Sequence, residues 1–158
     1  LEEAISLSLQ GIDEATFAVK REFGATALME TDREVLVQVV LILLHNSMEA
    51  LRDSEVAAKQ IIICSSQVED QVQIDIRDNG PGISNENLSA IFAQGFTTKE
   101  NSIGDGLHKA ANSIYLLGGS IQALEVSNGA VLRVELPIKQ AKVEFRSKVN
   151  SNVEAEQS

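Results

Sequence analysis

A carboxylate followed by a glycine turn is the most chemically suggestive stretch of the 158-residue chain. Asp78 ends a run in which apolar residues alternate from Val72 to Ile76, as they do in a half-buried strand. Gly80 and Gly82 follow, and glycines permit positive φ angles and a close approach of the backbone to a ligand. A carboxylate at such a strand tip can accept a hydrogen bond from the exocyclic amine of adenine. The same short pattern also suits a plain hairpin corner.

Two further features stand on either side of this turn. Asn46 lies in a long apolar segment that we expect to form one buried helix, and an Asn oxygen can ligate Mg²⁺. Gly104 and Gly106 open a second expected helix, residues 106–117, whose N-terminal N–H groups could hold phosphates. Asn46 could also be a satisfied polar residue near a helix end. The three features in this order indicate a nucleotide site.

A single lysine stands in the long connection between the turn and the second helix. Lys99 is the only cation between Asn79 and Asp105, in a segment we expect to act as a lid that is mobile without nucleotide. It is a natural partner for a terminal phosphate, and a solvated surface lysine is the equally weighted alternative. His45 and His108 have no Ser or Cys nucleophile at motif spacing, which argues against a hydrolase triad.

The remaining segments must position these residues. Alternation and turn signals predict strands at residues 15–23, 27–29, 60–66, 71–78, 120–126 and 131–136, and a short helix at residues 86–92. Thr31 or Asp32 can cap the long helix that contains Asn46. We therefore expect an α/β (α+β) two-layer sandwich, with a mixed, mostly antiparallel sheet and helices on one face.

Composition limits the function classes that remain. The net charge of −10 argues against binding to nucleic acid or to an anionic membrane surface. The single cysteine, Cys64, excludes an internal disulfide and a zinc cluster, and we expect it to pack inside a strand. The longest apolar run is too short to span a bilayer. Because the chain starts at Leu1 without a methionine, we expect it to be a piece of a longer protein.

These motifs resemble the ATP-binding domain of the GHKL superfamily, and most closely the catalytic domain of bacterial sensor histidine kinases. The resemblance covers about residues 13–137, with Asn46 in the N box, Asp78 in the G1 box and a Phe-Thr-Thr-Lys ending at Lys99 in the F box. It implies a Bergerat-type fold, ATP and Mg²⁺ as cofactors, Asn46 as metal ligand and Lys99 as catalytic residue. The implied nucleotide-binding residues are Asn46, Asp78, Gly80, Gly82, Ile83, Phe96, Thr97, Lys99, Gly104, Gly106 and Leu107.

The resemblance also implies partners and a domain plan. Residues 1–12 would end an upstream dimerisation-type helix, residues 13–138 would form the catalytic domain, and residues 139–158 would be a polar linker or tail. The domain would donate the γ-phosphate of ATP to a histidine on an upstream helical domain of the same protein, a homodimer at full length. A response regulator would be the downstream partner, the location would be cytoplasmic, and the isolated fragment would be inactive by itself.

Four residues depart from the family pattern and support an alternative. They are Ile42, Ser102, Asp105 and Ala130. Ala130 stands where the family has a small hydroxyl residue near the adenine, and Asp105 adds negative charge near the expected phosphates. The alternative is a degenerate module of this superfamily that binds nucleotide weakly or not at all and acts through protein–protein interaction. A clamp ATPase is disfavoured, because Ile42 stands where those relatives carry the carboxylate that activates water.

Overall fold

The sheet and the helices that cover it account for most of the described chain. The computed structural model describes residues 6, 10, 17–25, 30–96 and 104–138. Within these residues the sheet has five strands in the order β1-β2-β3-β5-β4, with β1 parallel to β2 and the other pairs antiparallel. The strands are β1 (Ala18–Phe23), β2 (Gln60–Val68), β3 (Gln71–Asp78), β4 (Ser120–Leu124) and β5 (Ala130–Pro137). The expected mixed, mostly antiparallel sheet is confirmed.

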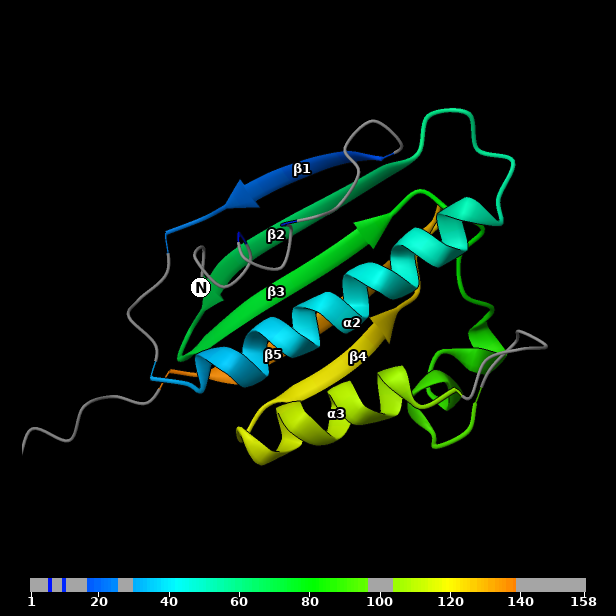
Figure 1. The fold of residues 1–158 in the computed structure, drawn as a ribbon. Helices are drawn as coiled ribbons and strands as arrows, with labels where there is room; N and C mark the ends of the chain where they lie inside the picture. Colours follow the sequence, from blue (N-terminus) through cyan, green and yellow to red (C-terminus); the bar gives the residue numbers. More distant parts are fainter. Residues whose placement is uncertain (1–5, 7–9, 11–16, 26–29, 97–103, 139–158) are drawn as a thin grey trace, which may run out of the picture.

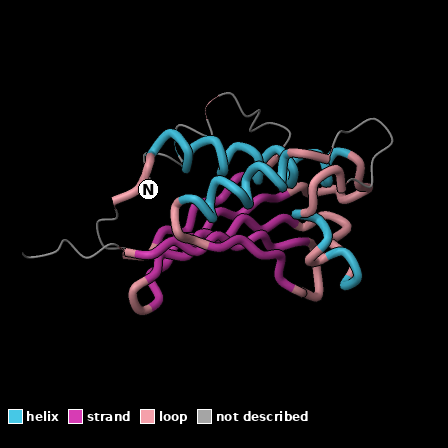
Figure 2. Tube along the Cα trace, turned by 90° about the horizontal axis from the view of Figure 1, so that it is seen from below, coloured by secondary structure: helices cyan, strands magenta, loops and turns pink. Residues whose placement is uncertain are grey.

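Helices α2 and α3 lie side by side on one face of this sheet (Figures 1 and 2). Helix α2 (Arg33–Arg52) begins at Asp32, whose Oδ1 accepts hydrogen bonds from the N–H groups of Glu34 at 3.0 Å and Val35 at 3.1 Å. Helix α3 (Gly106–Leu116) packs beside α2 and over β4. Together they give the expected two-layer sandwich.

The core lies between the helices and the sheet. Alternate residues of β2, β3 and β5 point toward the helices, which is why the sequence alternates there. The fully buried aliphatic side chains come from both layers and include Leu36, Leu43, Leu44, Leu51, Ile61, Ile63, Ile74, Ile76, Ile114 and Leu132. By length and composition α2 could cross a membrane, but a core helix passes the same test, and α2 buries one side in this core.

The face of the sheet away from the helices carries polar side chains. Arg133 donates two hydrogen bonds to Asp75, from Nε at 2.7 Å and Nη2 at 2.9 Å, and Arg77 donates a third at 2.8 Å. We call these three residues the far-face ion cluster. Cys64 also lies in β2 on this face, half-buried, with Sγ 3.6 Å from a carboxylate oxygen of Glu22. The expectation that Cys64 packs in the core was therefore wrong, because the core positions of β2 are the alternate ones.

Some expected elements differ from the structure or fall outside it. Instead of one helix at residues 86–92 there are two short 3₁₀ turns, η1 (Asn85–Asn87) and η2 (Ala90–Phe92). Asn and Ser side chains interrupt this segment, and such residues compete with the helical backbone for hydrogen bonds. The expected strand at 27–29, the upstream helix at 1–12 and the tail at 139–158 lie largely or wholly outside the described residues.

Candidate functional site

The end of β3 places the Asp78 carboxylate between the sheet and α2. Asp78 is only 9% exposed, and its Oδ1 accepts a hydrogen bond from the N–H of Gly80 at 3.0 Å. Burial raises the pKa of Asp78, and the Gly80 N–H, the Ser47 hydroxyl and the Ala130 N–H offset only part of this effect. No ion pair joins Asp78 to a cation in the described chain. A buried carboxylate without a cation retains capacity to accept hydrogen bonds from a ligand.

The glycine turn after Asp78 is tightly enclosed. A Cβ on Gly80 would lie 3.0 Å from Oδ1 of Asp78 and 3.5 Å from the side chain of Leu51. Gly82 has a φ of +83°, and a Cβ there would lie 2.8 Å from the carbonyl oxygen of Gly129. Only Gly82 therefore needs a positive φ; Gly80 is required for space. The turn fits between the end of α2 and the β4–β5 hairpin, which fixes the position of Asp78.

Asn79, between these residues, has a structural role that the sequence did not reveal. Its Oδ1 accepts a hydrogen bond from the N–H of Gln60 at 2.8 Å, and its Nδ2 donates to the carbonyl of Ala58 at 2.7 Å. These bonds fasten the tip of β3 to the chain that enters β2. The two bonds fix the backbone next to Asp78, and neither of them uses the Asp78 carboxylate.

Asn46 and the start of α3 lie in neighbouring parts of the helical layer. Asn46 is half-buried on α2, one turn after Ile42, and a Cβ on Gly106 would lie 3.5 Å from Cγ2 of Ile42. Asp105 precedes α3 but makes no side-chain hydrogen bond to the first turn. The N–H groups at Gly106 and Leu107 are thus not capped by that carboxylate, which suits an anion at this end of the helix.

An Asn side-chain oxygen is a ligand type that Mg²⁺ accepts, and the metal-binding role of Asn46 stays a prediction. The described residues contain no group of three or more His, Cys, Asp or Glu side chains that could hold a metal ion. Mg²⁺ is commonly bound by one or two protein oxygens together with phosphate oxygens and water. Such an ion would therefore take most of its ligands from the nucleotide and from water.

The segment after the glycine turn is anchored to the core by aromatic and aliphatic side chains. Ile83, Phe92, Phe96 and Leu107 are partly buried against the core, and Phe92 and Phe96 are the aromatic anchors among them. Nδ1 of His108 is 3.1 Å from the carbonyl oxygen of Phe92, and Nδ2 of Asn112 donates to Nε2 of His108 at 3.0 Å. His108 therefore carries its proton on Nδ1 and fastens η2 to α3.

The two ends of the remaining lid segment meet at its base. Gly104 has a φ of +70°, and a Cβ on it would collide with the carbonyl oxygen of Phe96. Thr97, Lys99 and Ser102 lie between these two residues, outside the described part of the chain. Their roles, and the expected mobility of the lid, stay predictions.

Ser47 is a site residue that sequence reasoning missed. Its side chain is 1% exposed, and its hydroxyl has no hydrogen-bond partner in the described structure. The hydroxyl lies near enough to Asp78 to lower the pKa of that carboxyl, although the two groups do not meet with hydrogen-bonding geometry. A serine beside Asn46 in an apolar helix gave no sequence signal for this role.

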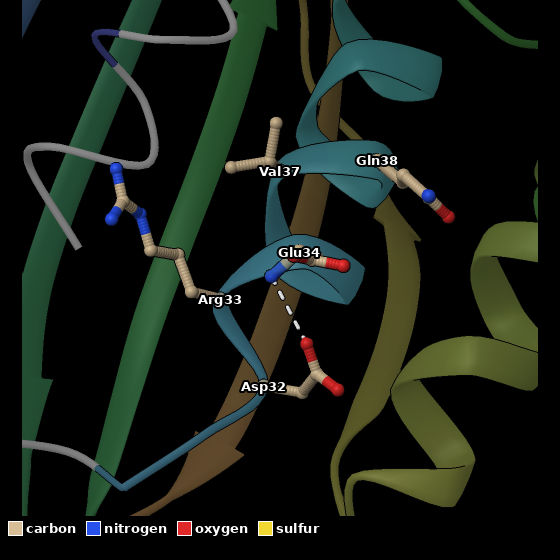
Figure 3. A pocket seen from close by; sticks show the side chains of 5 residues that line it. All are labelled: Asp32, Arg33, Glu34, Val37 and Gln38. Carbon is tan, nitrogen blue, oxygen red and sulfur yellow. Dashed lines mark hydrogen bonds between the residues drawn. The ribbon is translucent and has the colours of Figure 1, made fainter.

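A surface hollow at the other end of α2 is not part of this site. It is lined by Asp32, Arg33, Glu34, Val37 and Gln38 (Figure 3). Arg33 precedes Asn46 by 13 positions along the helix, a distance of about 20 Å. Figure 3 also shows the Asp32 carboxylate directed at the N–H of Glu34, so the cap already occupies this helix terminus.

Comparison with known proteins relates this geometry to one family. Residues 31–140 match the family described as histidine kinase-, DNA gyrase B-, and HSP90-like ATPase. The sensor protein CitS of Halalkalibacterium halodurans is 35% identical over 119 residues, which cover 74% of this chain and 22% of that protein. The curated relatives that it matches are thus several times longer than the aligned segment.

Solved structures give the same relation. The catalytic domain of histidine kinase ThkA in a nucleotide-free form has a TM-score of 0.76 and 28% identity, covering 87% of this chain and 92% of that one. A structure of ThkA in complex with the response regulator protein TrrA has a TM-score of 0.65 and 27% identity, covering 87% of this chain and 39% of that one.

Proposed function

Because the chain belongs to the family of histidine kinase-, DNA gyrase B- and HSP90-like ATPases and has the fold of a histidine kinase catalytic domain, we propose that it binds Mg-ATP and donates the γ-phosphate to a histidine. The acceptor would lie on an upstream helical domain of the same protein. The observation that carries the proposal is the buried Asp78 carboxylate, which lacks a cation in the described chain and is held at the strand tip. It offers a fixed acceptor for the amine of adenine.

Each residue of the site contributes to binding or positioning. Asp78 accepts from the adenine amine, while Gly80 and Gly82 allow the backbone to approach the ligand closely. The N–H groups at the start of α3 favour the phosphates, and Lys99 would pair with the terminal phosphate. Asn46 would hold Mg²⁺, which neutralises phosphate charge when bound. Phosphoryl transfer then depends on positioning and charge neutralisation, without a covalent intermediate on this domain.

The position that precedes Asn46 by one turn distinguishes transfer from hydrolysis. Ile42 stands there and packs next to Gly106, so this position offers no group that could take a proton from water. We expect negligible phosphate release by the chain alone, and phosphorylation of histidine when a matching upstream helical domain is supplied. Vigorous hydrolysis that Glu49→Gln abolishes would contradict this assignment and favour a clamp ATPase.

The proposal extends to partners that belong to the whole protein. In a full-length protein we propose a homodimer through the upstream helices, a response regulator as phosphate acceptor after the histidine, and a cytoplasmic location for this domain. Support for the regulator comes from the similar kinase ThkA, whose solved complex contains the response regulator TrrA.

The decisive experiment is calorimetric titration of the chain with ATP, with and without Mg²⁺. We expect one binding site, tighter binding in the presence of Mg²⁺, and no comparable binding of GTP. An absence of heat, together with no effect of ATP on thermal unfolding, would overturn the proposal. It would favour the interaction module suggested by the departures at Asp105 and Ala130.

A further inference from the structure

The last turn of α3 carries the most exposed large apolar side chains of the described residues. Tyr115 and Leu116 are 78% and 84% exposed, whereas the other exposed side chains of this kind in the described chain are 41% to 47% exposed. The buried side of the helix is made by Ala110 and Ile114, so Tyr115 and Leu116 point away from the core. We call these two residues the α3 patch. Neighbouring apolar side chains on a surface commonly mark a place that another segment or molecule covers.

The size of the α3 patch argues against a second copy of the chain as its partner. A stable dimer interface buries about 800 Å² on each partner, with about 20–30 residues a side. The exposed residues that precede the patch along α3 include Lys109 and Asn112, which are polar. A short segment of the same chain is a better match, because a tether removes most of the entropic cost of association.

The described sheet ends beside the α3 patch. A Cβ on Gly118, two residues after Leu116, would lie 3.7 Å from Cγ of Pro137, the last residue of β5. The end of α3 and the end of β5 are thus at the same end of the sheet (Figure 1). Residues 139–158 of the sequence follow this point, so the segment that leaves the sheet starts next to the patch.

The sequence after β5 contains one stretch that fits an apolar surface. Apolar and charged residues alternate over positions 141–146, so an extended chain would place Val143 and Phe145 on one side. Val143 follows Ile138 by five positions, and five extended residues reach about 17 Å. The patch lies only two residues of helix before Gly118, a rise of about 3 Å. The alternating stretch can therefore reach the patch.

Charge favours the same segment. The C-terminus of a helix carries a partial negative charge, which a nearby cation stabilises, and α3 has no basic residue in its last turn. Residues 139–148 carry four basic side chains and one acidic side chain, in a chain whose net charge is −10. A basic segment beside the end of α3 therefore supplies charge that the helix itself lacks.

We propose that the α3 patch is the docking site of residues 141–146 of the same chain, with Val143 and Phe145 covering Tyr115 and Leu116. The docked segment closes an apolar surface that would otherwise promote association between copies of the chain. This inference does not depend on nucleotide binding, so it can fail while the proposed function stands.

The composition of the chain makes the test direct, because Tyr115 is its only tyrosine and it has no tryptophan. Tyrosine fluorescence therefore reports on the α3 patch alone. In the 158-residue chain, Val143→Ser/Phe145→Ser should raise the acrylamide quenching constant of Tyr115 about 2-fold, because the side chains that cover the ring are lost. Val149→Ser/Val153→Ser, outside the alternating stretch, is the matched control and should leave quenching unchanged.

Limited trypsin digestion tests the contact from the side of the helix. Leu116→Ser should speed cleavage after Arg146 about 3- to 10-fold, because the rate follows the population of the undocked segment. Val68→Ser is the control. It removes an exposed apolar side chain at the end of β2, and the rate of cleavage after Arg146 should not change.

Two outcomes would overturn the inference. If Tyr115 is quenched equally in the wild type and in Val143→Ser/Phe145→Ser, the segment does not cover the patch, which then serves a partner outside this chain. If quenching instead falls as protein concentration rises and sedimentation velocity detects a dimer, the occupant is a second copy.

Discussion

Two aspartates on one strand, three positions apart, are both buried but differ in their partners and in the direction of their pKa shift. Asp75 and Asp78 both belong to β3 and are 5% and 9% exposed. Burial raises the pKa of Asp75, but hydrogen bonds from Arg133 and Arg77 outweigh it and hold the pKa below its ordinary value. At Asp78 burial is the larger effect, and the pKa is raised. The ion pairs of Asp75 stabilise the fold, whereas Asp78 has no cation partner in the described chain, which is why we propose it as the ligand-binding carboxylate.

The largest expected effect is that of Asp78→Ala on nucleotide binding. A hydrogen bond to a charged acceptor contributes about 1.5–3 kcal/mol, so ATP affinity should fall about 10- to 150-fold while the fold stays intact. Calorimetry measures the affinity, and circular dichroism with thermal unfolding checks the fold. If the variant binds ATP as tightly as the wild type, the site lies elsewhere.

Asp75→Asn should show the reverse pattern, with a loss of stability and no loss of affinity. It leaves Arg77 and Arg133 without their counter-charge, and breaking a buried pair costs about 3–5 kcal/mol. The side chains of Arg77 and Arg133 are 48% and 25% exposed, so solvent reduces the expected cost to about 2–3 kcal/mol. Urea unfolding measures it. A drop in ATP affinity similar to that of Asp78→Ala would remove the distinction between the two aspartates.

The pH dependence of stability should separate the same two residues. Because the pKa of Asp75 is lowered in the folded state, the ionised carboxylate contributes fully to the free energy of unfolding above the pKa of the unfolded chain, about 3.9. This contribution is lost as pH falls through the pKa of the folded state. The raised pKa of Asp78 has the opposite sign: its ionisation destabilises the folded state at neutral pH, and protonation removes that penalty as pH falls toward about 3.9.

Asp78→Asn should therefore be more stable than the wild type at pH 7, and the difference should vanish near pH 4. Urea unfolding of both proteins across this range measures the difference. Asp75→Asn serves as the control, because its deficit should shrink only below about pH 3.9. A constant difference between Asp78→Asn and the wild type would show that the Asp78 carboxyl keeps its ordinary pKa.

The smallest expected effect is that of Asn46→Ala, which should remove only the Mg²⁺-dependent part of ATP affinity. Loss of one neutral oxygen ligand should weaken Mg-ATP binding about 3- to 10-fold. Affinity measured in the presence of a chelator should not change. Equal losses of affinity with and without Mg²⁺ would contradict the metal-ligand role. They would mean that Asn46 contacts the nucleotide itself, as we propose for Asp78.

The sequence predicted the sheet and its two covering helices because their apolar periods are long and regular. β3 was expected at residues 71–78 and is found there, and α3 begins at Gly106 as expected. The prediction of a short helix at residues 86–92 was wrong, because a few residues that include Asn and Ser cannot offset the cost of nucleating an α-helix. Short segments depend on tertiary contacts, such as that of His108 with the carbonyl of Phe92.

The site was only partly predictable, because some of its residues act through neighbours that are distant in sequence. Asp78 and Asn46 were proposed from motif spacing, and their ligand roles stay predictions. The two hydrogen bonds of the Asn79 side chain need Gln60 and Ala58 as partners. The far-face ion cluster needs Arg133, which is 58 positions from Asp75. Alternation of Asp75 with Arg77 could have placed those two on one face. Nothing in the sequence indicated that the Ser47 hydroxyl would be unbonded.

The contact of Gly104 with the Phe96 carbonyl bears on how this domain can diversify. Loop-closure entropy is the main cost of changing the length of a connection, and here the ends are joined by Phe96 packing and the Gly104 backbone. Each doubling of the intervening length should cost only about 0.6 kcal/mol. The sheet can therefore stay unchanged while the segment between these two residues is exchanged or lengthened.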